Sequence, residues 1–297
     1  MRTATFSGID AIDAVTEVLR RVYETHPVGG LFHAADVQFW WARERSTDAL
    51  EQLFWIDDDG QPAAAAMVVD LGGGTSLVYD EVTFCPFVLG DASDDHTLEV
   101  LHAGLAHAAE LGFEFVESEV AHDDAVTRKA LLARGFEVTV PEALVECWVD
   151  ADARAEISPL ADGYELRSRT QTAGRPHHMN READDAIDRR LNQLSLYDPD
   201  LDLVVFASDG TPAGNAIFWF DPVTRTGVVE PVRTHDDHQR RGIARHLLTT
   251  GLDLLARAGA ERISIGYEPD NPASGDAYRG VGFEPVTGSA LFRGPTG

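Results

Sequence analysis

The stretch EPVRTHDDHQRRGIAR at residues 230–245 decides how we interpret this chain of 297 residues. The apolar spacing that follows Gly242 predicts a helix over 242–258, with a strand before the loop. N–H groups at the start of a helix have no partner inside the helix, so they bind anions well. Gly242 has no Cβ to hold an anion away from the backbone. Three nearby arginines add positive charge in an otherwise acidic protein: Arg240, Arg241 and Arg245. The pattern predicts a pyrophosphate site.

A second stretch, NPASGDAYRGVGF at residues 271–283, lies one predicted helix and one predicted strand further along. Together the two stretches resemble the GNAT superfamily of N-acetyltransferases. The acetyl-CoA loop of that family, Gln/Arg-x-x-Gly-x-Gly/Ala, is matched at residues 239–244. Its later motif is matched by an asparagine, a tyrosine and a Gly-Phe pair: Asn271, Tyr278, Gly282 and Phe283. The resemblance covers about residues 162–297 directly, and the first half only through an internal repeat.

The resemblance implies acetyl-CoA as cosubstrate and a role for each matched position. The strand before the loop would bind the pantetheine arm through its backbone, as an added β-strand does; its residues are Val232, Arg233 and Thr234. The loop and helix start would hold the pyrophosphate: Gln239, Arg240, Arg241, Gly242, Ile243, Ala244 and Arg245. Asn271 would contact the pantetheine amides, and Tyr278 would lie near the sulfur of CoA.

Two residues are candidates for the chemistry of amine acetylation. The amine must lose a proton before it attacks the thioester, because an alkylammonium group has a pKa near ~10. Glu230, on the strand beside the expected thioester, is the candidate general base. The phenol of Tyr278 can supply a proton or a hydrogen bond to the leaving thiolate. The alternatives are structural: Glu230 pairs with an arginine or caps the strand, and Tyr278 packs on its short helix.

The two halves of the chain repeat one another. Residues 60–66 align with 210–216, and the Gly-Phe pair at 135–136 aligns with the pair at 282–283. We therefore predict a degenerate GNAT-like domain over 1–150, a linker over 151–162 and a catalytic GNAT domain over 163–297. The fold class is α/β (α+β), and each domain has a central mixed, largely antiparallel sheet flanked by helices.

The first half departs from the family pattern at the loop. Residues 91–97, DASDDHT, align with the acetyl-CoA loop, and they contain three carboxylates and no glycine. Negative charge at this place weakens the binding of a pyrophosphate. We therefore expect the first domain to keep the fold without a cofactor site, and to shape the acceptor pocket.

The composition excludes several classes of function. Asp and Glu number 50 against 24 Lys and Arg, and the formal net charge of −26 argues against nucleic acid and against a polybasic membrane anchor. The sequence contains no long apolar run and no leader pattern, and Cys85 and Cys147 are far apart, so we expect a cytoplasmic protein.

No metal site is expected. We expect His177 and His178 to form an exposed loop pair, with contact to the acceptor as the alternative. A tandem repeat favours a monomer, with a dimer as the alternative.

These features predict an N-acetyltransferase that moves an acetyl group from acetyl-CoA to a primary amine by direct attack in a ternary complex. The small acceptor is expected to be cationic, because the acidic surface would attract an antibiotic or another polyamine. The alternative is a non-catalytic acyl-CoA-binding sensor or regulatory protein, which would keep the loop but would not need Glu230 or Tyr278. Acceptor residues lie on variable loops, so the sequence does not identify the amine.

Overall fold

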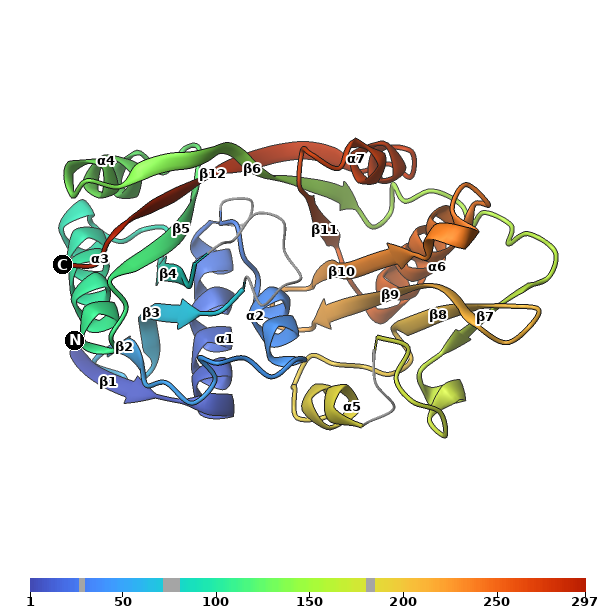
Figure 1. The fold of residues 1–297 in the computed structure, drawn as a ribbon, viewed down its shortest axis with the longest axis horizontal. Coiled ribbons are helices and arrows are strands. Elements are labelled where there is room, and N and C mark those ends of the chain that lie inside the picture. The colour runs from blue at the N-terminus through green and yellow to red at the C-terminus, as the bar shows by residue number, and fades with distance from the viewer. Residues whose placement is uncertain (27–29, 72–80, 180–184) are drawn as a thin grey trace. The chain divides into compact units, whose positions relative to one another are not determined.

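The computed structural model describes residues 1–26, 30–71, 81–179 and 185–297 (Figure 1). The chain divides into two compact units. Unit 1 contains Met1–Val145 and Thr287–Gly297, and unit 2 contains Glu146–Val286. Among the residues of these described ranges, no helix is long and apolar enough to cross a membrane. The glycine triplet at 72–74, for which the sequence predicts a hairpin turn, lies outside the described residues.

Unit 1 has a mixed sheet around a buried apolar core. The strand order is β1-β2-β3-β4-β5, followed by residues 287–295 of β12 and 137–145 of β6. The pairs β1–β2, β2–β3 and β3–β4 are antiparallel, whereas the pair β4–β5 is parallel. The elements are β1 (Arg2–Phe6), α1 (Gly8–Thr25), α2 (Ala34–Trp41), β2 (Gln52–Ile56), β3 (Pro62–Val69), β4 (Thr83–Val88), α3 (Asp94–Glu110), β5 (Phe115–Ala121), α4 (Ala125–Ala133) and most of β6 (Glu137–Asp150).

Unit 2 repeats this plan. The strand order is β7-β8-β9-β10-β11, followed by residues 146–150 of β6. The pairs β7–β8, β8–β9 and β9–β10 are antiparallel, and the pair β10–β11 is parallel. The elements are β7 (Tyr164–Ser168), the short helix η1 (Thr170–Thr172), α5 (Ala186–Leu191), β8 (Asp202–Ala207), β9 (Pro212–Asp221), β10 (Thr226–Thr234), η2 (Asp236–His238), α6 (Ile243–Ala258), β11 (Arg262–Tyr267), α7 (Pro272–Arg279) and the start of β12 (Glu284–Pro295).

The predicted fold class and the predicted repeat are confirmed. Helix α3 joins β4 to β5 in unit 1, as α6 joins β10 to β11 in unit 2, and each joined pair of strands is parallel. The helix expected over 242–258 is α6, which begins at Ile243 and ends before Gly259 in a left-handed conformation with φ of 110°. A C-terminal glycine of this conformation is a common helix stop.

The units differ from the predicted division into 1–150, 151–162 and 163–297. Residues 287–295 of β12 complete unit 1, since they pair with β5 from Ser289 opposite Ala121 to Pro295 opposite Phe115. Residues 146–150 of β6 instead belong to unit 2. An unpaired edge of β5 would leave its N–H and C=O groups without partners, and a strand from the far end of the chain satisfies them. A repeat in the sequence identifies the strands but not the sheet that each one joins.

Helix α6 lies directly on β9. The side chains of Leu247, Leu248, Leu252 and Leu255 are fully buried. The helix approaches so closely at Gly251 that an added Cβ would lie 2.0 Å from the ring of Phe218 on β9. Only a residue without a side chain fits there.

We therefore expect Gly251→Ala to lower the Tm by about 2–8 °C. Overpacking a core costs about 1–3 kcal/mol, and a contact of 2.0 Å places this substitution at about 2–3 kcal/mol. A better helix propensity returns about 1 kcal/mol, and each of the remaining ~1–2 kcal/mol shifts Tm by about 2–4 °C in a protein of this size. The control is Gly174→Ala, because an added Cβ at Gly174 meets no atom within 4 Å. Calorimetry of both variants tests this expectation, and equal Tm values for the two would contradict it.

Candidate active site in unit 2

The strand pair at the centre of unit 2 opens before the end of β10. In β10 and β11, both fully described, parallel pairing runs from Thr226 opposite Arg262 to Val228 opposite Ser264 and stops there. Strand β10 continues along β9 to Thr234, with a register shift between Val229 and Val232. This shift lies at Pro231, which has no backbone N–H to donate to a neighbouring strand. Beyond Val228, the backbone on the β11 side can accept an extended ligand as an added strand.

The loop after β10 ends in an open helix start. Gly242 precedes the first residue of α6 with φ of 79°, a left-handed conformation that favours glycine. The side chains of Arg240, Arg241 and Arg245 are exposed. Arg241 donates to the carbonyl oxygen of Asp237 at 3.3 Å. The predicted pyrophosphate loop thus has the charge and the backbone conformation of an anion site at a helix N-terminus.

Tyr278 and Glu230 interact electrostatically within unit 2. Tyr278 lies on α7 and is 8% exposed, with its ring 6.1 Å from that of Tyr267 and 6.4 Å from that of Phe283. Burial raises the pKa of Tyr278, and the negative charge of Glu230 raises it further. The phenol therefore stays protonated at neutral pH and is available as a donor. The carbonyl oxygen of Glu230 accepts from Trp219 Nε1 at 2.7 Å, which fixes the backbone there.

Asn271 has a structural role that the sequence analysis did not anticipate. It is the N-cap of α7, and its Oδ1 accepts from the backbone N–H of Ser274 at 3.4 Å. An asparagine at this position satisfies a helix start in the unliganded chain. Its contact with pantetheine stays a prediction.

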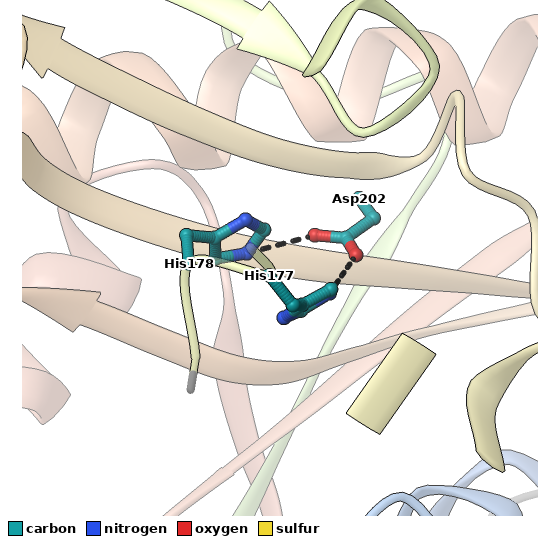
Figure 2. A group of neighbouring side chains, drawn as sticks. All are labelled: His177, His178 and Asp202. Carbon is teal, nitrogen blue, oxygen red and sulfur yellow. Dashed lines mark hydrogen bonds and ion pairs between the residues drawn. The ribbon is translucent and has the colours of Figure 1, made fainter. Parts of the chain in front are cut away.

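The structure brings together a buried polar cluster from the two histidines and the start of β8 (Figure 2). His177 Nε2 lies 2.8 Å from Asp202 Oδ2, and His178 Nε2 lies 3.0 Å from Asp202 Oδ1. The imidazole rings stack with centroids 4.3 Å apart. Tyr197 donates its hydroxyl to Asp202 Oδ2 at 2.7 Å. The expectation of an exposed loop pair is wrong, because the side chains of His177 and His178 are 0% and 2% exposed.

The sequence analysis missed Asp202 and Tyr197. The available signal was a carboxylate inside the apolar run LDLVVF at residues 201–206. A buried carboxylate needs donors, and the neighbouring histidines and tyrosine supply them. Distance along the chain hid this arrangement, because His177 and Asp202 are brought together only by folding.

The cluster holds atoms that can ligate a metal, but its hydrogen bonds do not fit one. Among the described residues, His177, His178 and Asp202 are grouped with ligand atoms within 4.8 Å of one another. However, His177 Nδ1 accepts from the backbone N–H of Met179 at 3.1 Å, so Nδ1 carries the lone pair. A neutral His177 then carries its proton on Nε2, where it donates to Asp202. Nε2 of His177 has no lone pair left for a metal ion.

The helix start in unit 1 differs as the sequence predicts. Ser93 caps α3 by accepting from the backbone N–H of His96 at 3.3 Å, and Asp94 and Asp95 occupy the first turn. A cavity of about 360 Å³ lies beside this helix start. Four of its lining side chains are carboxylates: Asp94, Glu119, Asp123 and Asp124. The charge of this cavity is opposite to the charge that a pyrophosphate needs.

Unit 2 combines a gap between two parallel strands with an open helix start that is flanked by arginines. Residues 160–283 match the model of the acetyltransferase (GNAT) family, whose members transfer acyl groups from acyl-CoA. A search of the curated proteins found no match.

Solved structures share the fold over the whole chain. A tandem GNAT protein from the clavulanic acid biosynthesis pathway has a TM-score of 0.71 at 12% identity, covering 100% of this chain and 98% of its own. A GNAT-family acetyltransferase from Colwellia psychrerythraea has a TM-score of 0.60 at 12% identity, covering 99% of each chain. A GCN5-related N-acetyltransferase from Sphaerobacter thermophilus has a TM-score of 0.59 at 15% identity, covering 99% and 96%. The predicted tandem GNAT architecture is confirmed.

The buried cluster makes stability depend on pH. Burial raises the pKa of Asp202, but its interactions with His177 and His178 outweigh this effect, so the pKa lies well below its ordinary value of 3.8. A carboxyl group with a lowered pKa stabilises the fold above its unfolded pKa, and this stability is lost as the pH falls.

We expect Asp202→Asn to reduce the free energy of unfolding at pH 7, and the deficit to narrow as the pH falls below about 3.8. Urea denaturation of both proteins across this pH range measures the deficit. The exposed Asp270→Asn is the control, with no such trend expected. A deficit for Asp202→Asn that does not change with pH would show that ionisation of this carboxyl group is not what stabilises the cluster.

Proposed function

We propose that this protein is an acetyl-CoA-dependent N-acetyltransferase with one active site, in unit 2. The observation that carries the proposal is the position of three features on consecutive elements. Strand β10 separates from β11 after Val228. Gly242 directly precedes the first residue of α6, beside exposed arginines. Burial and the negative charge of Glu230 raise the pKa of the Tyr278 phenol. A thioester in the gap would have an anion site at one end and a proton donor at the other.

The residues proposed to hold acetyl-CoA are those matched at the sequence level. The backbone of Val232, Arg233 and Thr234 would bind the pantetheine arm. The helix start would hold the pyrophosphate through the backbone of Gly242, Ile243 and Ala244 and the side chains of Gln239, Arg240, Arg241 and Arg245. Asn271 would reach the pantetheine amides. The bound cosubstrate supplies an activated acetyl group.

Glu230 and Tyr278 have complementary roles in the proposed reaction. Glu230 accepts a proton from the acceptor, so that a neutral amine can attack the carbonyl carbon. A C–N bond forms and the C–S bond breaks. Tyr278, which remains protonated at neutral pH, donates to the departing sulfur.

The proposed acceptor is a small molecule with a cationic primary amine. The formal net charge of −26 attracts cations over a long range, and Glu230 would bind an ammonium group before deprotonation. The competing function is an acyl-CoA-binding sensor. Thiol release from acetyl-CoA with a panel of polyamines, aminoglycosides, neutral amines and anionic amino acids tests the proposal. Binding of acetyl-CoA without release for any amine would favour the sensor.

We expect one acetyl-CoA per chain by calorimetry and no binding to Gly242→Glu, which adds bulk and negative charge at the pyrophosphate position. The matched control is Gly210→Glu, because Gly210 has a similar left-handed φ of 83° and an equally open surrounding. Its binding should equal that of the wild type. A stoichiometry of two would contradict the expectation that unit 1 lacks a cofactor site.

Tyr278→Phe should slow turnover by about 10²–10⁴-fold, the usual contribution of a general acid, with little change in the Kd of acetyl-CoA. Steady-state kinetics with the best amine and calorimetry measure the two quantities. Tyr267→Phe is the control, because this ring packs against Tyr278 while its hydroxyl accepts from Arg279. Equal rates for wild type and Tyr278→Phe would assign Tyr278 to packing.

A further inference from the structure

We propose that His178 is a second proton acceptor in the acetyl transfer, oriented by Asp202. The inference rests on the proposed function and adds a catalytic residue to it. The argument uses the hydrogen bonds of the buried cluster, its place on the sheet and the number of protons that an ammonium acceptor must lose.

The two histidines of the cluster differ in how their nitrogens are satisfied. Both nitrogens of His177 have partners, Met179 N–H at Nδ1 and Asp202 at Nε2. His178 Nε2 lies 3.0 Å from Asp202 Oδ1, a distance at which two lone pairs would repel, so the proton of a neutral His178 belongs on Nε2 and the lone pair on Nδ1. In the part of the chain that the structure describes, this contact lacks the geometry of a hydrogen bond, and both ring nitrogens of His178 are buried without a hydrogen-bond partner.

An unsatisfied buried nitrogen destabilises the protein, so each one in a native structure needs an explanation, and a catalytic role is one such explanation. A neutral imidazole with a carboxylate beside one nitrogen has its other nitrogen ready to accept a proton. Asp202 is well suited to hold it, since Oδ2 is fixed by His177 and Tyr197 while Oδ1 faces His178.

The sheet register places Asp202 two strands away from the segment of β10 that contains Glu230. Asp202 is opposite Ile217 on β9. Phe218 and Ala216, on either side of Ile217, are opposite Val229 and Val232 on β10, so Ile217 lies across from the bulge that contains Glu230. Two strand spacings of about 4.8 Å separate the backbones of Asp202 and Glu230.

Side-chain contacts also connect the cluster to the backbone of Glu230. Phe218 faces α6, and because side chains alternate along a strand, Ile217 and its partner Asp202 point to the opposite face. Tyr197 packs its ring against Trp219, 6.0 Å between centroids, and Trp219 Nε1 donates to the carbonyl oxygen of Glu230.

Tyr197 also connects the cluster to the surface. It lines a hollow of about 830 Å³ in unit 2, together with Pro176 and the ion-paired side chains of Arg169 and Asp188. Pro176 directly precedes the two histidines. An amine that entered this hollow would meet Tyr197, which donates its hydroxyl to Asp202.

Two protons leave the acceptor nitrogen during the reaction, which gives a second proton acceptor a role. The balanced reaction is R–NH₃⁺ + acetyl–S–CoA → R–NH–acetyl + HS–CoA + H⁺. The nitrogen loses two protons, one before it attacks and one after the C–N bond forms. Tyr278 returns one proton to the thiolate and is reprotonated, and the other proton leaves to solvent. Glu230 accepts one proton from the nitrogen, and His178 Nδ1 accepts the other.

The experiment compares His178→Ala and His178→Gln with His177→Ala, using the best amine of the panel. We expect both His178 variants to lose about 10²-fold or more in kcat/KM, with acetyl-CoA affinity close to wild type and a smaller loss of Tm than His177→Ala. Added imidazole should restore part of the rate of His178→Ala alone. His177→Ala should lower the Tm, because it removes two satisfied hydrogen bonds, and imidazole should not rescue it.

Each other outcome overturns the proposal. Activity of His178→Gln within twofold of wild type would remove His178 from the reaction. Equal losses of Tm and rate in the His177 and His178 variants, without rescue, would make the cluster purely structural. A stoichiometric metal ion in the purified wild type, absent from His178→Ala, would make the cluster a metal site. If the wild type itself releases no thiol with any amine, the proposed function fails, and this inference fails with it.

Discussion

The separation of β10 from β11 after Val228 is the constraint on which the site depends. Parallel strands satisfy each other's backbone groups as long as they stay paired. Where the pairing stops, β10 keeps only its β9 partner, and its other side can receive an extended ligand. Helix α6 follows directly, so the end of the gap and an anion-binding helix start lie on consecutive parts of the chain. Close packing of α6 at Gly251 holds that helix start in place.

The same architecture occurs twice with opposite electrostatics. In unit 1, β4 and β5 pair at Thr83 opposite Glu117, and α3 follows β4 as α6 follows β10. The α3 start carries Asp94 and Asp95, whereas the α6 start is flanked by arginines. The two units therefore share a backbone plan and differ in the charge of the side chains at the helix start.

Local patterns in the sequence predicted the features that depend on local chemistry. Apolar spacing located α6, and the repeat predicted two copies of one fold. Pairing between distant segments was not predictable in this way. The placement of residues 287–295 on β5 depends on which edge is open in the folded chain. The burial of His177 and His178 likewise depends on Asp202, which no spacing rule links to them.

Hydrogen–deuterium exchange with and without acetyl-CoA tests the central claim, a single cofactor site at the opening of unit 2, most directly. The account predicts slower exchange at residues 229–234 and at the start of α6, with unchanged exchange at residues 91–97 and the start of α3. Protection at the start of α3, or equal protection of both helix starts, would contradict the account.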